Sequence, residues 1–144
     1  MPGLSAGYHR LNRARAGQNP SDPVAAFALN NERRMFEAFS QLLAFSIPIV
    51  VGTDAGVALT RFDETCLELS LLVKAGMTPP DALEAATCNA AHVLGLSDKL
   101  GTLEKDKYAD VIACSGNPLK DIHALEQVTW VMRGGQIIRD DRVL

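Results

Sequence analysis

The chain has 144 residues, a hydrophobic content of 47% and a formal net charge of −3 at pH 7. This length and composition suit a globular domain with a packed core and do not suit a disordered chain. The acidic balance and the scattered lysines and arginines form no basic stripe, which argues against nucleic acid as a partner.

The first elements along the chain are a loop and a long helix. Residues 1–23 are rich in Gly, Asn, Arg and Pro and show no apolar period, which predicts a loop. In residues 24–45 apolar side chains recur at helical spacing, which predicts an amphipathic helix. The apolar positions of this helix are Phe27, Met35, Phe36, Phe39, Leu42 and Leu43.

A buried strand and a second helix are expected next. Residues 49–51 form a β-branched run without polar alternation, as in a strand buried on both faces of a parallel sheet. A polar loop to about Asp63 follows, and residues 64–75 are predicted to be helical, with Gly76 as a left-handed cap. This order of helix, strand, loop and helix indicates an α/β fold.

The last part of the chain changes from helix to strand. Thr78-Pro79-Pro80-Asp81 combines an N-cap hydroxyl, an early proline and a carboxylate in the first turn, and predicts a helix that reaches Val93 or Leu94. Residues 109–114 are expected to form a strand, and residues 128–139 a hairpin with a glycine turn. The three strands would form a separate small sheet or the edge of one.

The cysteines and the apolar segments bear on the location of the protein. Cys66, Cys88 and Cys114 are odd in number and far apart, which predicts reduced, mostly buried thiols in a cytoplasmic protein. The longest apolar stretch is too short to span a bilayer, and the N-terminus lacks the apolar core of a signal peptide. No membrane role is expected.

Asp54 is the candidate active-site carboxylate. It follows the predicted buried strand, within Thr53-Asp54-Ala55-Gly56, where α/β barrels and open α/β sheets place reacting groups. The alternative interpretation is that Asp54 caps the loop, as aspartates at strand ends often do. The residues by themselves leave both interpretations open.

Several segments, in the same order, resemble the amidohydrolase superfamily, close to imidazolonepropionases and Xaa-Pro dipeptidases. They are residues 49–56, 68–79, 82–91, 100–112, 116–119 and 131–135. The resemblance implies an α/β fold made of two parts. Residues 1–98 would be the C-terminal part of a (β/α)8 metal-dependent hydrolase barrel, and residues 99–144 would be strands of the accompanying small β domain.

The resemblance also implies a reaction. Asp54 matches the aspartate at the end of the eighth barrel strand, which binds the metal or its water and moves a proton. A divalent metal, zinc foremost, would activate water and polarise the carbonyl of a small amide or peptide-like substrate. The carboxylate would take the proton of the water and deliver it to the leaving amine.

The other metal ligands of the family have no counterpart in this sequence. The family's His-x-His pair on the first strand, its bridging lysine and its histidines on the fifth and sixth strands are missing, and one carboxylate does not hold a catalytic metal. His92 and His123 lie where a structural or surface role is expected. His9 and Arg61 fall in segments that would face the substrate, Arg61 as a bidentate partner of a carboxylate. A surface role is the alternative for both.

Two hypotheses follow from the sequence. Under the first, the chain is the C-terminal portion of a hydrolase of C–N bonds, without activity or metal until an N-terminal half complements it. Under the second, it is a non-enzymatic α/β module that works by binding or assembly. Under either hypothesis, exposed strand edges and apolar helix faces predict a homo-oligomer.

Overall fold

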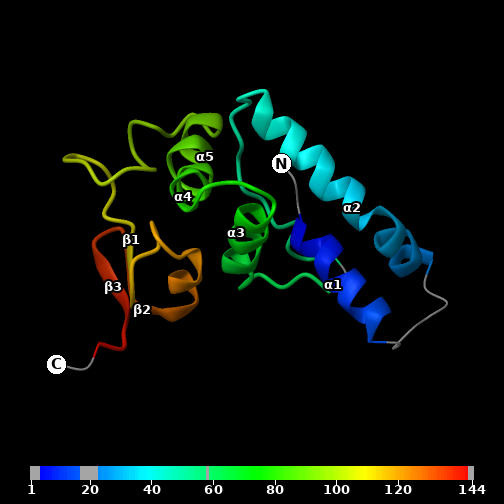
Figure 1. The fold of residues 1–144 in the computed structure, drawn as a ribbon. Coiled ribbons are helices and arrows are strands. Elements are labelled where there is room, and N and C mark those ends of the chain that lie inside the picture. The colour runs from blue at the N-terminus through cyan, green and yellow to red at the C-terminus, as the bar shows by residue number, and fades with distance from the viewer. Residues whose placement is uncertain (1–3, 17–22, 58, 143–144) are drawn as a thin grey trace. The chain divides into compact units, whose positions relative to one another are not determined.

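The structure, a computed structural model, describes residues 4–16, 23–57 and 59–142. The chain divides into two compact units, Met1–Met77 and Thr78–Leu144 (Figure 1). The first unit contains helices, and the second contains two short helices and a small sheet. The expected division after residue 98 follows the family's architecture and stays a prediction.

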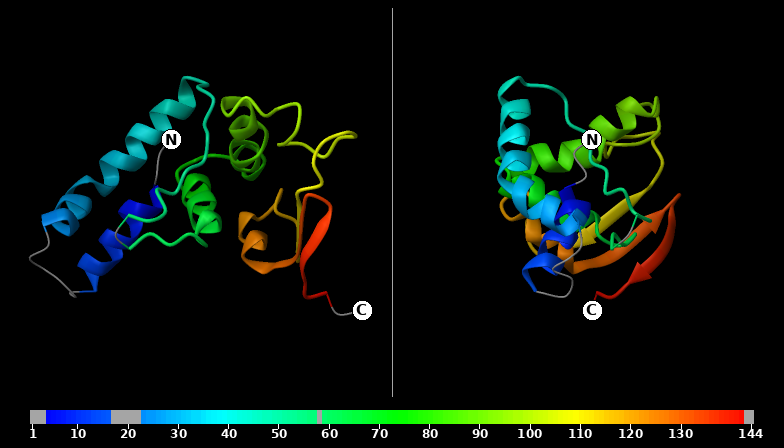
Figure 2. Two further views of the ribbon diagram at one scale, coloured as in Figure 1. Left: turned by 180° about the vertical axis from the view of Figure 1, so that it is seen from behind. Right: turned by 90° about the vertical axis from the view of Figure 1, so that its right-hand side faces the viewer.

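Three helices build the first unit. They are α1 (Leu4–Arg15), α2 (Pro23–Ala44) and α3 (Thr65–Lys74). Helices α1 and α2 lie side by side and run in opposite directions (Figures 1 and 2), and α1 also contacts α3. Phe39 of α2 and Leu72 of α3 are deeply buried, with 2% and 0% of their surface exposed. Apolar burial of this kind holds short helices that would be marginal alone.

Helix α1 corrects the prediction of a loop over residues 1–23. Leu4, Ala6 and Leu11 of α1 are buried in the unit, although the segment shows no clear apolar stripe in the sequence. Its first two amide groups are bound by Glu68, a residue far along the chain. The helix is therefore stabilised by tertiary contacts. Residues 1–3 and 17–22 of the predicted loop lie outside the described residues.

The strand predicted at residues 49–51 is not formed. Residues 47–54 are irregular, with the side chains of Ile49, Val50 and Val51 half-buried. A strand is stable only beside a neighbour that satisfies its backbone groups. In the ranges that the structure describes, the only sheet consists of β1, β2 and β3, and this segment does not belong to it.

The predicted helix after Thr78 begins as expected and is then interrupted. Thr78 accepts a hydrogen bond from the backbone N–H of Asp81, which confirms the N-cap. The helix is divided into α4 (Pro79–Ala86) and α5 (Cys88–Val93) at Thr87, which has a non-helical backbone. The Thr87 hydroxyl donates to the carbonyl of Leu83, a local bond that competes with regular helix geometry.

The C-terminal strands form the predicted small sheet. Its elements are β1 (Val111–Cys114), the 3-10 helix η1 (Ile122–Gln127), β2 (Val128–Arg133) and β3 (Gln136–Asp140). The strands are antiparallel in the order β1-β2-β3. Gly134 and Gly135 join β2 to β3 with φ values of 56° and 80°, as a tight hairpin turn requires.

Two findings bear on the expectations about location. None of the helices in the described ranges is both long enough and apolar enough for a membrane crossing. The three cysteines, Cys66, Cys88 and Cys114, were expected to be mostly buried and are half-buried.

Candidate active site around Asp54

Asp54 lies in a tight turn with its side chain exposed. Its φ of 53° is in the left-handed region, which aspartate tolerates better than most residues. The carbonyl of Asp54 accepts from the N–H of Val57 at 3.1 Å, and the Thr53 hydroxyl accepts from the N–H of Ala55 at 3.2 Å. The first bond is accepted by Asp54 itself and the second spans it, and together they define the turn.

The carboxylate of Asp54 does not close this turn. Within the described part of the chain it makes no hydrogen bond or ion pair, while the backbone and the Thr53 side chain supply the bonds of the loop. A capping aspartate would accept a bond from a nearby backbone N–H. The geometry therefore leaves the Asp54 carboxylate free to contact a ligand.

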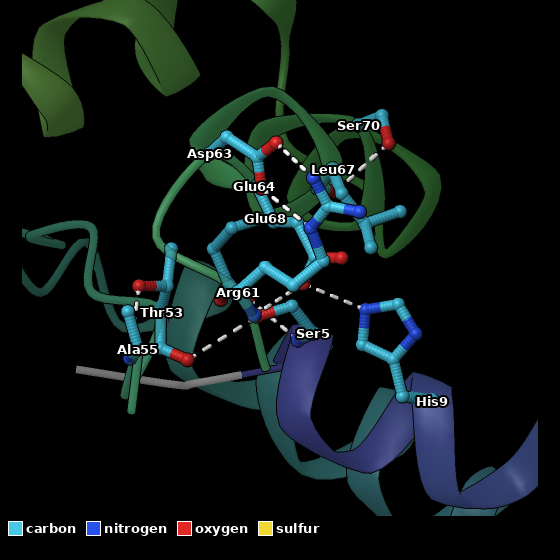
Figure 3. Close-up of polar contacts among 10 residues, drawn as sticks. All are labelled: Ser5, His9, Thr53, Ala55, Arg61, Asp63, Glu64, Leu67, Glu68 and Ser70. Atoms are coloured by element: carbon cyan, nitrogen blue, oxygen red, sulfur yellow. Dashed lines mark hydrogen bonds and ion pairs between the residues drawn. The ribbon is translucent and has the colours of Figure 1, made fainter. Parts of the chain in front are cut away.

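A buried carboxylate joins α3 to the start of α1. Glu68 is fully buried and accepts from the N–H of Leu4 at 2.8 Å. It also accepts from the N–H of Ser5 at 2.6 Å (Figure 3). The N-terminus of a helix leaves its first amides unpaired and favours negative charge. The hydroxyl of Ser5 donates to the carbonyl of Thr53 at 3.4 Å, directly before Asp54.

A second carboxylate, that of Glu64 directly before α3, binds the far end of the loop that carries Asp54. Oε2 of Glu64 lies 2.8 Å from Nε2 of His9 and accepts from the N–H of Arg61 at 3.0 Å (Figure 3). The His9 and Glu64 side chains are 25% and 16% exposed. Tyr8 packs edge-on against the His9 ring. The structure thus places His9 beside the loop that carries Asp54, with one ring nitrogen bound by Glu64.

Arg61 points its guanidinium at a neighbour in the chain. Its Nε donates to Oδ1 of Asp63 at 2.9 Å, and its Nη2 lies 2.5 Å from Oδ2. The hydrogen bond lowers the pKa of Asp63 and raises that of Arg61. Both side chains are largely exposed. A carboxylate ligand would have to displace Asp63 to bind Arg61 in the bidentate way that the sequence suggested.

The other two histidines lie in the second unit. His92 is exposed on α5. Nδ1 of His123 lies 2.7 Å from Oε1 of Glu126 on η1, and this hydrogen bond raises the pKa of His123. The surroundings of both residues match the surface role that the sequence predicted.

Glu64 and Glu68 are the residues that sequence reasoning missed. One signal was present, because Glu68 is the only acid in the apolar run 66–73 of a predicted helix. A buried acid on an apolar helix face needs hydrogen-bond donors from elsewhere in the fold. The sequence contains no sign that these donors are the first amides of α1.

The residues present do not form a metal site by themselves. Among the described residues, no three His, Cys, Asp or Glu side chains are grouped so that they could hold a metal ion. Catalytic metal sites in proteins commonly take three protein ligands. Asp54 alone does not meet that requirement.

Comparisons with known proteins show relatives of similar sequence that are much longer. Ochratoxinase from Aspergillus niger is 36% identical over 108 residues, which cover 72% of this chain and 22% of that protein. An imidazolonepropionase from Shouchella clausii is 32% identical over 131 residues, or 85% of this chain and 28% of that protein. This chain therefore spans less than a third of the length of these relatives.

Solved structures resemble nearly the whole chain. A Xaa-Pro dipeptidase with bound methionine in its active site has a TM-score of 0.82 and 30% identity, covering 96% of this chain and 34% of that one. A putative prolidase from Bifidobacterium longum has a TM-score of 0.81 and 32% identity, covering 99% and 36%. The profile of the Amidohydrolase family, whose members are generally metal-dependent, matches residues 11–138. This chain belongs to the amidohydrolase family.

Proposed function

We propose that this chain is the C-terminal part of a metal-dependent hydrolase that cleaves an amide or peptide-like C–N bond, with Asp54 as its metal-facing, proton-transferring carboxylate. The observation that carries the proposal is the exposed carboxylate of Asp54, which makes no bond to the described residues and stands on a turn fixed at both ends. The match to the Amidohydrolase family over residues 11–138 supports the class of reaction.

The proposed chemistry needs one carboxylate that acts twice. When water attacks an amide, the water loses a proton and the leaving nitrogen gains one. A single exposed carboxylate can accept the first proton and then donate it to the nitrogen, so that the carboxylate is restored when the C–N bond has broken. Asp54 has the exposure for this role, and its fixed turn limits the motion of its backbone.

The metal in this proposal, with zinc as the expected ion, would depend on ligands beyond those described in this chain. A complementing N-terminal part would supply them. We therefore propose that the 144 residues alone neither hold a stoichiometric metal nor catalyse the reaction. A cytoplasmic location is proposed as well, on the odd number and wide spacing of the three cysteines.

His9 and Arg61 are proposed as substrate contacts. His9 lies beside the Asp54 loop and is oriented by Glu64, and the guanidinium of Arg61 is exposed. A cationic group near the site would suit a substrate that carries a carboxylate, as peptides do. Arg61 would then exchange Asp63 for the substrate.

A chimera tests the proposed function. This chain replaces the matching segment of the Bifidobacterium longum putative prolidase, and hydrolysis of an Xaa-Pro dipeptide and bound metal are measured. We expect activity and metal in the chimera, neither in the isolated chain, and a loss of kcat of about 10²- to 10⁴-fold in Asp54→Asn, the usual contribution of acid-base catalysis.

The matched control is Asp106→Asn. Asp106 is also an exposed aspartate with a left-handed backbone, at a φ of 69°, in a turn of the second unit. Its substitution should leave activity unchanged. An Asp54→Asn chimera with full activity would refute the role of Asp54, and an inactive chimera with Asp54 intact would favour the non-enzymatic module.

A further inference from the structure

Two acids, Glu64 directly before α3 and Glu68 in its first turn, together bind α1 and the loop that carries Asp54. Glu68 binds the first amides of α1, and Glu64 binds His9, one turn further along α1. The first turn of α1 and Glu64 also bind the loop that carries Asp54, one at each end of the loop. Ser5 bonds the carbonyl of Thr53, and Glu64 bonds the N–H of Arg61.

From this arrangement we propose that Glu68 is a positioning residue for Asp54, acting through the first turn of α1 and the Ser5 hydroxyl. The inference rests on the proposed function of Asp54. Glu68 does not contact the turn itself. It fixes Ser5, Ser5 fixes the carbonyl of Thr53, and the Thr53 hydroxyl fixes the N–H of Ala55. Asp54 stands between Thr53 and Ala55 in the chain, so its backbone is held on both sides.

The hydrogen bonds of Glu68 suit a residue that positions Ser5 better than one that only fills space in the core. A fully buried carboxylate is unfavourable unless hydrogen bonds compensate it, and here both oxygens are used on adjacent backbone amides. Those amides are among the few in a helix that have no partner within the helix. The pair of bonds therefore sets both the position and the direction of the first turn of α1, and so the position of the Ser5 hydroxyl.

The test uses the full chain and two substitutions. Glu68→Gln keeps the volume but replaces one acceptor oxygen with an NH2 group that faces a backbone N–H. Ser5→Ala keeps Glu68 and the helix and removes only the hydroxyl that reaches Thr53. Glu84→Gln is the matched control, because it makes the same chemical change on an exposed residue of α4.

Amide hydrogen exchange, followed by NMR, is the measurement on the chain alone. We expect exchange at Ala55 and Gly56 to become about tenfold faster in Glu68→Gln, and faster by a smaller factor in Ser5→Ala, as when roughly one hydrogen bond is lost. The amide of Leu72 in α3 should keep its rate in Ser5→Ala, and Glu84→Gln should change neither site. In the chimera, Glu68→Gln should lower kcat with KM unchanged.

Two results would overturn the inference. One is exchange in Glu68→Gln that rises equally at Leu72 and at the loop, which would show that Glu68 only stabilises the unit. The other is unchanged exchange at Ala55 and Gly56 in Ser5→Ala, which decides the question even if Glu68→Gln does not fold. Failure of the proposed function has a different signature, because an active Asp54→Asn chimera would leave these exchange rates as predicted.

Discussion

At the scale of single residues, the backbone conformation of Asp54 bears on whether its carboxylate holds the loop or contacts a ligand. A side chain other than glycine in the left-handed region costs about 1–2 kcal/mol. Such a conformation persists when the surrounding structure imposes it, and it often marks a functional position. Asp54 has this strained φ of 53°, and within the described residues its carboxylate makes no bond that would offset the strain.

Replacement of Asp54 by glycine should therefore not weaken the fold. Glycine removes the left-handed strain of about 1–2 kcal/mol but adds roughly 0.5–1 kcal/mol of backbone entropy to the unfolded chain. We expect Asp54→Gly to leave the free energy of unfolding in urea unchanged or to raise it by up to about 1.5 kcal/mol. A clear decrease would indicate that the carboxylate holds the loop, as the alternative interpretation requires.

His123 provides a pH-dependent contact in the second unit. Its hydrogen bond to Glu126 raises its pKa above 6.5 in the folded chain. A raised pKa means that the pair stabilises the fold fully below about pH 6.5 and that this contribution is lost as the pH rises through the raised pKa.

The measurement is an NMR titration of the His123 ring. We expect a midpoint above 6.5 in the native chain and a return toward 6.5 in Glu126→Gln. Both side chains are more than half exposed, so the effect on overall stability should be small. A midpoint that does not respond to Glu126→Gln would show that the pair does not form in solution.

At the scale of elements, a close approach to α5 explains why glycine stands at position 101, within the segment 100–112 that resembles the family. Gly101 has a φ of 96°, and a Cβ there would lie 2.7 Å from Cβ of Ala91 and 2.9 Å from Cα of Cys88. Both neighbours belong to α5, and one of the contacts is with backbone. The close approach therefore depends on the absence of a side chain at Gly101.

Gly101→Ala should destabilise the second unit more than a glycine substitution in an open turn. Gly134 also has a positive φ, of 56°, but no atom lies within 4 Å of the place of its Cβ. We expect Gly134→Ala to cost about 1–2 kcal/mol through strain alone, and Gly101→Ala to cost at least about 1 kcal/mol more through overpacking. Thermal unfolding of the two variants compares these costs, and equal losses would contradict the close packing.

At the scale of the whole molecule, the apolar surface of the chain predicts self-association. Large apolar side chains of the second unit are exposed, among them Leu103, Ile112 and Ile138, with 82%, 53% and 63% of their surface accessible. In the part of the chain that the structure describes, the outer strands β1 and β3 each have one neighbour. Exposed apolar side chains and open strand edges favour association.

Light scattering tests this prediction directly. We expect a mass above the 15.5 kDa of one chain, and a shift toward the monomer in Ile138→Lys, which places a charge on the outer strand β3. A monodisperse native monomer would contradict the prediction.

The sequence determined the parts of this protein that rest on contacts between near neighbours. The N-cap at Thr78, the glycine hairpin at Gly134-Gly135 and the amphipathic helix over residues 24–45 all depend on residues within a few positions of one another. The family could be predicted for a related reason, because its short segments occur in order along the chain.

Only the tertiary structure decided the features that depend on distant residues. Helix α1 forms where a loop was predicted because Glu68, 64 residues away, binds its first amide. Residues 49–51 look like a strand but form none, since a ladder needs a neighbouring strand that local sequence does not specify. The sequence made Asp54 a candidate. The hydrogen bonds of Glu68, Ser5 and Glu64 around its loop join segments that only folding brings together.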